Sequence, residues 1–442
     1  MTVPTAPRPT LQQIAAEVVG YDPQALPVAQ ASEFIARLVP KVQAVEMLPI
    51  RSALGRVLAR DIVATFNVPA ADNSAMDGYA LRSADLKAAG HTILRVTGSA
   101  FAGQPFGGHT ASGDCVRIMT GAVMPAGFDT VVPQEFVRVQ AHADGDLVSV
   151  AQHTVRAGDN RRCAGEDLAC GDAVLVTGRV LRPADLGMLA SLGRAEVPVF
   201  RRLRVAFFST GDELRSLGEP LDAGCVYDSN RYTLWGLLQR LGVELLDLGV
   251  VRDDPVALEA MFLHAAAAAD AVITSGGVSV GEADHTKQVM AKLGDVLFWR
   301  IAMRPGRPMA IGRIGQIGNP DGSGDSAILF GLPGNPVAVM VTFYAFVRDA
   351  LLAMSGATPQ PLLMLRAAST APIRKKPGRT EYQRGSVSRG VDGSWQVTVT
   401  GSQGSGILRS MSEANGLIVL GHAAGDVAAG EFVDVLPFDG LA

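Results

Sequence analysis

Residues 204–354 alternate between segments with strand character and segments with helix character. The apolar runs include LRVAFFST, VELLDLGVV, AVITSGG and AILFGLPG, and the helical patterns include SNRYTLWGLLQRLG, PVALEAMFLHAAAAA and VAVMVTFYAFVRDALLAM. This alternation predicts a mostly parallel sheet with helices on its faces. Ligands of such sheets bind beyond the carboxyl ends of the strands, so the loops TGDEL, RDDP, SGGVSVGEAD and GLPGNP are expected at one edge.

The rest of the chain indicates further domains, because 442 residues with 48% hydrophobic content exceed what one core usually organises. Short β-like runs separated by Gly, Pro and Asp predict a small β domain before the α/β region and a C-terminal β barrel after it. We therefore predict a multidomain α/β plus β protein with a discontinuous helical linker domain. The expected ranges are 1–30 for an N-terminal extension, 31–61 with 156–198 for the linker domain, 62–155 for the small β domain, 199–357 for the α/β domain and 358–442 for the barrel.

Composition gives no sign of a membrane or nucleic-acid partner. The longest apolar stretch, residues 337–347, is well short of the roughly 20 residues that span a bilayer. The N-terminus MTVPTAPRPT lacks the apolar core of a signal peptide, and a net charge of -4 gives no general attraction to nucleic acid. The four cysteines have no metal-site spacing. We expect a cytoplasmic protein with reduced thiols.

The segment AVITSGGVSVGEADHTK, residues 271–287, combines an apolar run typical of a buried strand, an adjacent pair of glycines and two acids. Gly276 and Gly277 allow backbone N–H groups to approach a phosphate at the start of the next helix. Glu282 and Asp284 would repel a bare phosphate, so a divalent cation that bridges carboxylate and phosphate is expected. The ligand predicted from this loop is a phosphate ester with magnesium. A Gly-rich turn with a capping acid is the alternative.

Other loops add acids and arginines, each with a structural alternative. Glu213 in TGDEL and Asp253 in RDDP could bind a metal, but acids before a helix commonly serve as caps. The segment FWRIAMRPGRPMA carries three arginines that could hold oxyanions or lie on a solvated basic edge: Arg300, Arg304 and Arg307. GLPGNP, residues 331–336, predicts a rigid turn near the ligand. In the small β domain, NSAMDGYAL and RIMTGA place Asp77 and Thr120 in segments that suit either ligand contacts or ordinary turns.

Together the motifs NSAMDGYA, RIMTGAVMP, STGDEL, RDDP, SGGVSVGEADHTK, RPGRP, GLPGNP and GRTEYQRG occur in the order seen in molybdopterin molybdenumtransferases. The chain closely resembles that MoeA family, which is related to the scaffold domain of gephyrin. The resemblance implies an elongated homodimer of four-domain subunits, with each active site between the α/β domain of one subunit and the β domain of the other. Asp77 and Thr120 would then act across the dimer.

The resemblance also implies a reaction, in which molybdate and adenylylated molybdopterin give molybdenum cofactor and AMP with the help of magnesium. Asp284, with Glu213 and Asp253, would hold the magnesium, and Arg300 and Arg304 the pterin-side phosphate or oxyanion. Arg384 and Ser405 would help to bind molybdate. The other substrate-binding residues implied are Ser275, Gly276, Gly277, Ser279, Gly281, Arg307, Pro333, Gly334 and Pro336. A molybdopterin adenylyltransferase and molybdoenzymes are the expected partners.

Two features depart from the family pattern. Arginines stand at 300, 304 and 307 where lysines are often found, in a chain with 33 arginines and 6 lysines, and Ala338 replaces an expected serine. The missing hydroxyl predicts weaker oxyanion affinity or a paralogue with altered metal preference. Three alternatives stay open: a molybdopterin adenylyltransferase, a non-catalytic dimeric scaffold, and an unrelated nucleotide-sugar enzyme or phosphoesterase with the same phosphate loop.

Overall fold

A six-stranded sheet forms the centre of the α/β domain in the computed structural model, which describes residues 9–143, 145–278, 285–315 and 326–438. The strands, in spatial order, are β16 (Glu244–Val251), β13 (Arg204–Thr210), β17 (Ala271–Ser275), β21 (Ala327–Leu332), β20 (Pro308–Ile314) and β18 (Gly294–Arg300). The first four pair in parallel, whereas β20 is antiparallel to both β21 and β18. The expected mostly parallel sheet is confirmed.

Both faces of this sheet are buried, which explains why its strands are apolar throughout rather than alternating. Along β13, Val205 and Phe207 join one core and Ala206 and Phe208 join another, because successive side chains point to opposite faces. Helices α5 and α6 supply the second core, and α4, α7 and α8 supply the first. Their bounds are α4 (Ser229–Arg240), α5 (Pro255–Ala268), α6 (His285–Leu293), α7 (Pro336–Thr342) and α8 (Arg348–Met354), with a π-helical turn at Phe343–Val347.

Two N-terminal helices, α1 (Leu11–Glu17) and α2 (Val28–Leu38), belong to the same first core. The apolar stripe of α2, which includes Phe34, Ile35 and Leu38, is buried there. Residues from 31 onward were expected in the linker domain, so α2 differs from that expectation. The physical reason is that this stripe packs against the π-helical turn and α8 of the α/β domain.

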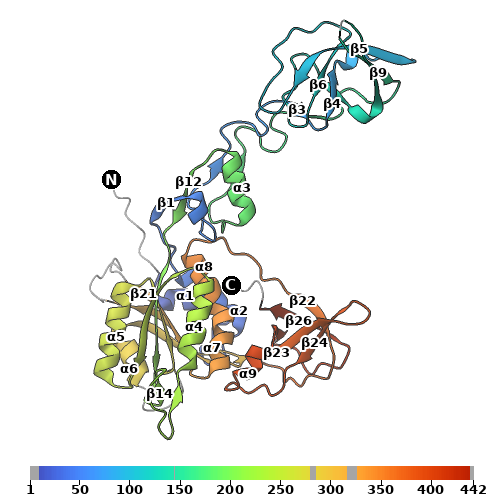
Figure 1. The fold of residues 1–442 in the computed structure, drawn as a ribbon. Coiled ribbons are helices and arrows are strands. Elements are labelled where there is room, and N and C mark those ends of the chain that lie inside the picture. Colours follow the sequence, from blue (N-terminus) through green and yellow to red (C-terminus); the bar gives the residue numbers. More distant parts are fainter. Residues whose placement is uncertain (1–8, 144, 279–284, 316–325, 439–442) are drawn as a thin grey trace.

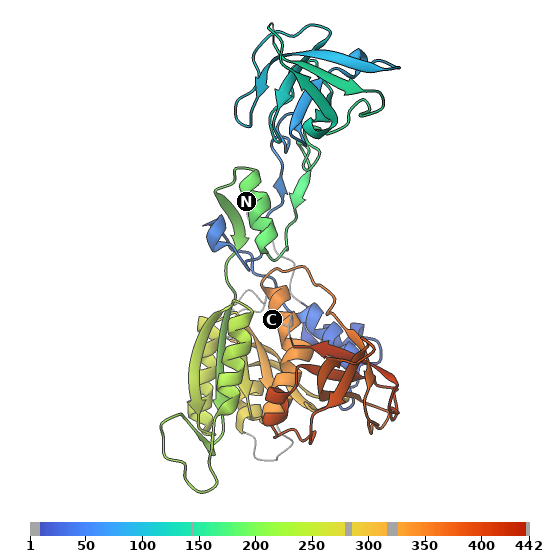
Figure 2. The ribbon, with the colours of Figure 1, turned by 45° about the vertical axis from the view of Figure 1, so that its right-hand side comes forward.

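The molecule is elongated, with the small β domain at one end and the α/β domain and barrel at the other (Figure 1). Between them stands the linker domain, built from two chain segments, and the turned view in Figure 2 shows it as a separate narrow layer. Its elements are β1 (Val45–Pro49), η1 (Ile50–Ser52), β2 (Ile62–Val63), β11 (Ala173–Leu175), α3 (Pro183–Ser191) and β12 (Glu196–Phe200). The discontinuous domain is therefore confirmed in its strands and in α3.

The small β domain is a six-stranded sheet in the order β7-β4-β6-β5-β9-β8. Its elements are β4 (Gly78–Leu81), η2 (Ser83–Asp85), β5 (His91–Ala100), β6 (Asp114–Ile118), β7 (Thr130–Pro133), η3 (Gln134–Phe136), β8 (Val137–Gln140) and β9 (Leu147–Ala151), with a short β3 (Asn73–Ser74) and β10 (Arg161–Arg162) pair at its base.

The C-terminal domain closes into a barrel because β23 pairs with both β24 and β25. The strands are β22 (Leu365–Ser369), β23 (Thr380–Arg389), β24 (Trp395–Val399), β25 (Gly416–Leu420) and β26 (Phe432–Pro437), and α9 (Arg409–Glu413) precedes β25. A short strand from the α/β domain, β19 (Met303–Arg304), also pairs with β23. The barrel is thereby fixed to the loop that carries Arg304.

One helical stretch among the described residues, Pro336–Met354, has the length and apolar character of a membrane span. It is 67% buried within the protein, where α7 and α8 pack in the first core of the α/β domain. Packing in the core accounts for its apolar composition.

Candidate active site

A cavity of about 830 Å³ lies at the carboxyl edge of the parallel strands. The ends of β13, β16, β17 and β21 contribute its α/β side, as expected for ligand sites in such sheets. The barrel contributes the opposite side through Arg379, Gln403 and Ser405. Of the residues singled out from sequence, the cavity brings together Glu213, Asp253, Gly276, Gly277, Arg304, Arg307, Pro333, Gly334, Ala338 and Ser405.

The glycine pair after β17 is held by close backbone packing. Gly276 has φ +93°, and a Cβ atom there would lie 2.5 Å from the Thr210 carbonyl oxygen. Gly277 has φ +66°, and a Cβ atom would lie 2.5 Å from the Thr286 side chain. A side chain at either position would therefore push the loop away from β13 or α6. The glycines place bare backbone on the cavity wall, which suits phosphate binding.

Ser275 differs from its neighbours in this loop. Its side chain is buried, and its hydroxyl lies 2.9 Å from the Ser209 hydroxyl, between β17 and β13. It does not line the cavity. Ser279, Gly281 and Asp284, which were expected to bind substrate or metal, lie outside the described residues.

Two carboxylates line the cavity from neighbouring strand ends, Glu213 after β13 and Asp253 after β16. The Asp253 amide donates to Asp212 Oδ1 at 3.2 Å, which joins the two loops. Asp254 instead caps α5, since its Oδ1 accepts from the Ala257 amide at 2.8 Å. Of the adjacent acids, one is a helix cap and the other faces the site.

The two carboxylates fit a magnesium ion whose coordination is completed by the substrate and water. Mg²⁺ commonly uses one or two protein carboxylates together with substrate phosphates and water. The described residues contain no group of three potential His, Cys, Asp or Glu ligands, so such an ion would rely on the substrate or on residues beyond them. The buried hydroxyl of Thr210, also on the cavity wall, has no hydrogen-bond partner, which is consistent with a polar ligand at this edge.

Arg304 and Arg307 line the cavity from the turn between β18 and β20. Gly306 makes this turn possible, because it has φ +98° and a Cβ atom there would lie 2.4 Å from Thr342 Oγ1. Arg300 does not line the cavity, although its neighbours 304 and 307 do. The three arginines therefore do not act as one cluster in the described structure.

Sequence reasoning missed Arg379, Gln403 and Asn335 on the cavity wall. Arg379 stands in GRTEYQRG, and its Nε donates to Glu381 Oε1 at 2.8 Å. Asn335, after β21, donates from Nδ2 to Ser405 Oγ at 3.1 Å, which joins the GLPGNP turn to the barrel. Arg379 comes just before β23 and Gln403 lies in a loop, so strand periodicity gave no signal for either residue.

Arg384 is 1% exposed and does not line the main cavity, but it lines an adjoining one of about 290 Å³ that shares Arg304 and Gln403. Its guanidinium donates to Ser410 Oγ at 3.0 Å and to the Gly404 carbonyl at 3.0 Å. Burial, with a smaller contribution from Arg304, lowers the pKa of Arg384 to about 10. These bonds fix the loop that carries Gln403 and Ser405. Pro336 likewise lies behind the cavity wall, as the first residue of α7.

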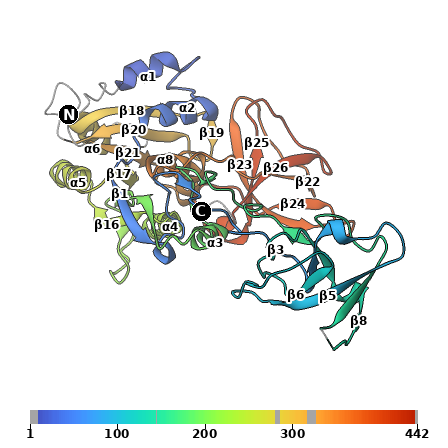
Figure 3. The ribbon, with the colours of Figure 1, turned by 90° about the horizontal axis from the view of Figure 1, so that it is seen from above.

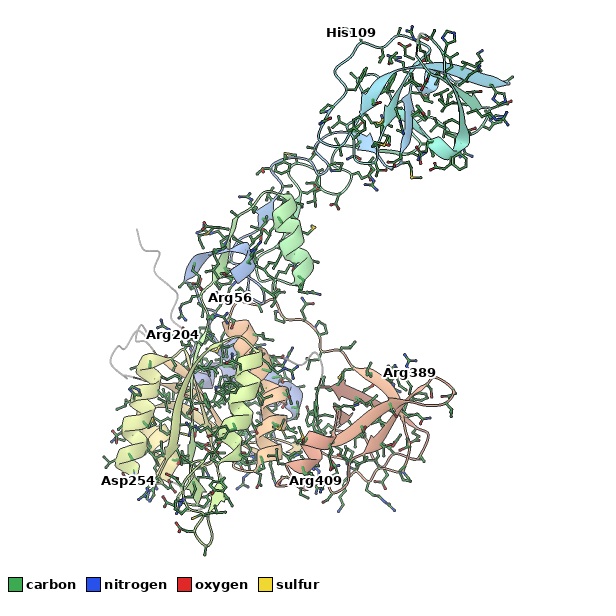
Figure 4. The ribbon with its side chains drawn as sticks, viewed as in Figure 1. Arg56, His109, Arg204, Asp254, Arg389 and Arg409 are labelled. Atoms are coloured by element: carbon green, nitrogen blue, oxygen red, sulfur yellow. The ribbon has the colours of Figure 1, made fainter. Side chains whose placement is uncertain are left out.

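Asp77 and Thr120 form a pair in the small β domain, at the far end of the molecule. Asp77 Oδ1 accepts from both the amide and the hydroxyl of Thr120, each at 2.7 Å. These hydrogen bonds lower the pKa of the Asp77 carboxyl. Figure 4 illustrates the separation, because His109 of the small β domain and Asp254 of the α/β domain mark opposite ends. Within one chain, this pair does not reach the cavity.

The fold and the cavity define a four-part α/β protein with a polar cavity between a Gly-rich loop and a β barrel. Residues 26–193 match the MoeA N-terminal region (domain I and II), residues 206–353 a probable molybdopterin binding domain, and residues 366–438 the MoeA C-terminal region (domain IV). The chain belongs to the MoeA family of molybdopterin molybdenumtransferases.

Individual relatives span nearly the whole chain. A molybdopterin molybdenumtransferase from Haemophilus influenzae is 41% identical over 417 residues, which cover 94% of this chain and 99% of that protein. One from Nostoc sp. is 36% identical over 418 residues, covering 92% and 93% respectively. The crystal structure of a molybdopterin biosynthesis moeA protein from Pyrococcus horikoshii is 28% identical with a TM-score of 0.79, covering 94% of this chain and all of that one.

Proposed function

We propose that this protein inserts molybdenum into adenylylated molybdopterin, using molybdate and Mg²⁺ and releasing AMP, to form molybdenum cofactor. The observation that carries the proposal is one cavity that joins a bare glycine loop, two carboxylates and two arginines. This combination of backbone donors, acids and guanidinium groups suits a phosphate ester with a cation and a second oxyanion. The names of the relatives support molybdopterin as the substrate class.

Each part of the cavity has a defined task in this proposal. Backbone N–H groups around Gly276 and Gly277 bind the phosphates, and Arg304 and Arg307 hold the oxyanions. Glu213 and Asp253, with Asp284, would hold Mg²⁺, which supplies charge neutralisation at the phosphates. Ser405 binds molybdate, and Arg384 holds the loop that carries Ser405. No protein nucleophile is needed. A molybdate oxygen can attack the adenylyl phosphorus, which breaks the bond to the bridging oxygen and leaves a phosphate on molybdopterin; the dithiolene sulfurs then take the molybdenum from the adenylyl molybdate, and AMP leaves.

We also propose a homodimer in which Asp77 and Thr120 complete the site of the second subunit. Within one chain this pair lies far from the cavity, and its lowered carboxyl pKa suits a fixed anionic acceptor. Tyr232 and Trp235 on α4 are about half exposed, at 48% and 49%, which offers aromatic surface for a second copy. The reaction takes place in the cytoplasm, supplied by an adenylyltransferase and serving molybdoenzymes.

The test is AMP release from adenylylated molybdopterin, measured with and without Mg²⁺ and molybdate. Asp253→Asn is the informative variant and Asp254→Asn its matched control, because Asn also caps a helix and Asp254 does not line the cavity. The proposal expects release that needs both additions, is lost in Asp253→Asn and persists in Asp254→Asn. Asp284→Ala should also abolish release. Binding without release by the wild type would instead favour a scaffold or paralogue.

A further inference from the structure

The loop that carries Arg304 and Arg307 is contacted by a segment from the opposite end of the sequence. Residues 21–26 run beside the end of β18, and Leu26 forms a parallel bridge with Ile301. The Leu26 amide donates to the Arg300 carbonyl at 3.1 Å, and the Arg300 amide donates to the Pro23 carbonyl at 2.8 Å. The Ala302 amide donates back to the Leu26 carbonyl at 2.8 Å. Three backbone hydrogen bonds thus join this segment to the start of the loop.

Side chains strengthen the same junction. Trp299 is 2% exposed and its indole N–H donates to the Tyr21 hydroxyl at 2.8 Å. The ring of Phe34 lies edge-on to Trp299, with centroids 5.1 Å apart, and stacks with Tyr21. Leu26 and Ile301 are fully buried in the core that contains Phe34. Seen from above in Figure 3, α1 and α2 lie along β18, the edge strand of the sheet.

On its other side, the loop is held by the barrel. Met303 and Arg304 form β19, which pairs with β23, and the Thr380 amide donates to the Ala302 carbonyl at 2.9 Å. Ala302 therefore bonds to the N-terminal segment through its amide and to the barrel through its carbonyl. The backbone that carries Arg304 is therefore held on both sides, by the N-terminal segment on one side and by the barrel on the other.

We propose that residues 21–26 are a positioning element for the cavity loop, with Tyr21 as the positioning residue that acts through Trp299 on Arg304 and Arg307. The effect on ligand binding rests on the proposed role of these arginines, whereas the effect on the loop does not. Tyr21→Phe removes the acceptor of a buried indole N–H without changing the ring. A buried donor without an acceptor destabilises the state in which residues 21–26 pack against β18. The segment therefore separates from β18 more often.

The experiment compares full-length wild type, Tyr21→Phe and Ile14→Val. Ile14 is a buried residue of α1, so Ile14→Val loosens the same N-terminal region without removing the Tyr21–Trp299 hydrogen bond. Amide hydrogen exchange is measured at Arg300 and Ala302, and equilibrium dialysis measures the Kd of molybdate. Tyr21→Phe is expected to accelerate both amides and to weaken molybdate binding by roughly threefold to tenfold. Ile14→Val is expected to change neither.

Unchanged exchange at Arg300 and Ala302 in Tyr21→Phe overturns the inference, as does an equal change in Ile14→Val. Faster exchange with an unchanged Kd also overturns it, because the loop would then move without affecting the arginines. If the wild type does not bind molybdate at all, the proposed function fails instead. In that case the exchange of the two amides still decides whether residues 21–26 position the loop.

Discussion

Residues of the cavity and the Asp77–Thr120 pair were both predicted from sequence to belong to the site, yet the structure places them in different domains. The cavity gathers groups from the sheet edge and the barrel within one chain. The Asp77 side chain accepts hydrogen bonds from Thr120, inside a small domain at the other end of an elongated molecule. Topology brings the groups at a sheet edge together within one chain, whereas a distal pair can reach them only if it belongs to a second copy.

The largest expected effect is in the cavity itself. Arg304→Ala should lower AMP release by roughly ten- to a hundredfold, because it removes charge-assisted hydrogen bonds to an oxyanion. The loss of AMP release in Arg300→Ala should be several-fold smaller than in Arg304→Ala, since Arg300 does not line the cavity. Initial rates with saturating molybdate measure the difference. Equal losses would mean that the cavity does not mark the reacting centre.

Mixing two impaired variants tests the distal pair. Asp77→Ala alone should lower AMP release by about tenfold, and a mixture refolded or co-expressed with Arg304→Ala should recover to about a quarter of wild-type activity. The reason is that half of the dimers are mixed and each of these has one site with both residues intact. Rates at the arithmetic mean of the two variants would show that Asp77 does not act across subunits.

A smaller effect is expected at Ala338, which lies in the first turn of α7 and lines the cavity. Ala338→Ser restores a hydroxyl and should tighten molybdate binding by roughly threefold to tenfold, the value of one hydrogen bond. Ala338→Cys is the control, because it has similar size but hydrogen-bonds weakly. Equal affinities in all three proteins would remove the concern about the missing serine.

The smallest effect on activity is expected at the junction between the two regions. Asp270 accepts two hydrogen bonds from Arg201, at 2.7 and 2.8 Å, where the linker domain enters the sheet. Burial alone would raise the pKa of Asp270, but the bonds from Arg201 and the Arg204 amide lower it overall. Its stabilisation is therefore present above the unfolded pKa of about 3.9 and is lost as pH falls through the lower folded pKa.

Asp270→Asn should accordingly lower the free energy of unfolding by about 2 kcal/mol at pH 7, and by less at pH 3. Urea unfolding at both pH values measures this, and AMP release at pH 7 should stay within about twofold. A large loss of activity would show that the orientation of the linker domain, and with it the distal pair, matters for catalysis. A difference that grows at low pH would contradict the pKa direction.

Much of the cavity could be predicted from sequence because its α/β part follows from local patterns and one topological rule. Apolar strands followed by helices put the ends of β13, β16, β17 and β21 at a common edge, so Glu213, Asp253 and Gly276 had to meet. Gly276 and Gly277 were predictable for a second reason, since their positive φ is readily available only to glycine. The exposed Asp77–Thr120 pair lies in loops whose position depends on the linker domain.

The sequence by itself determined the domain types, the parallel sheet and the α/β wall of the cavity, because these depend on periodicity and on neighbours close in the chain. On the other wall, Ser405 was expected from the family resemblance, and only the tertiary structure brought in Arg379 and Gln403. Arg379 faces the cavity while Arg384 is buried behind it, and the barrel meets the sheet through β19 and β23. The N-terminal segment at β18 was equally invisible in the sequence. Such contacts are set by packing between segments hundreds of residues apart. Local sequence patterns do not specify which of these segments pair or at which residues.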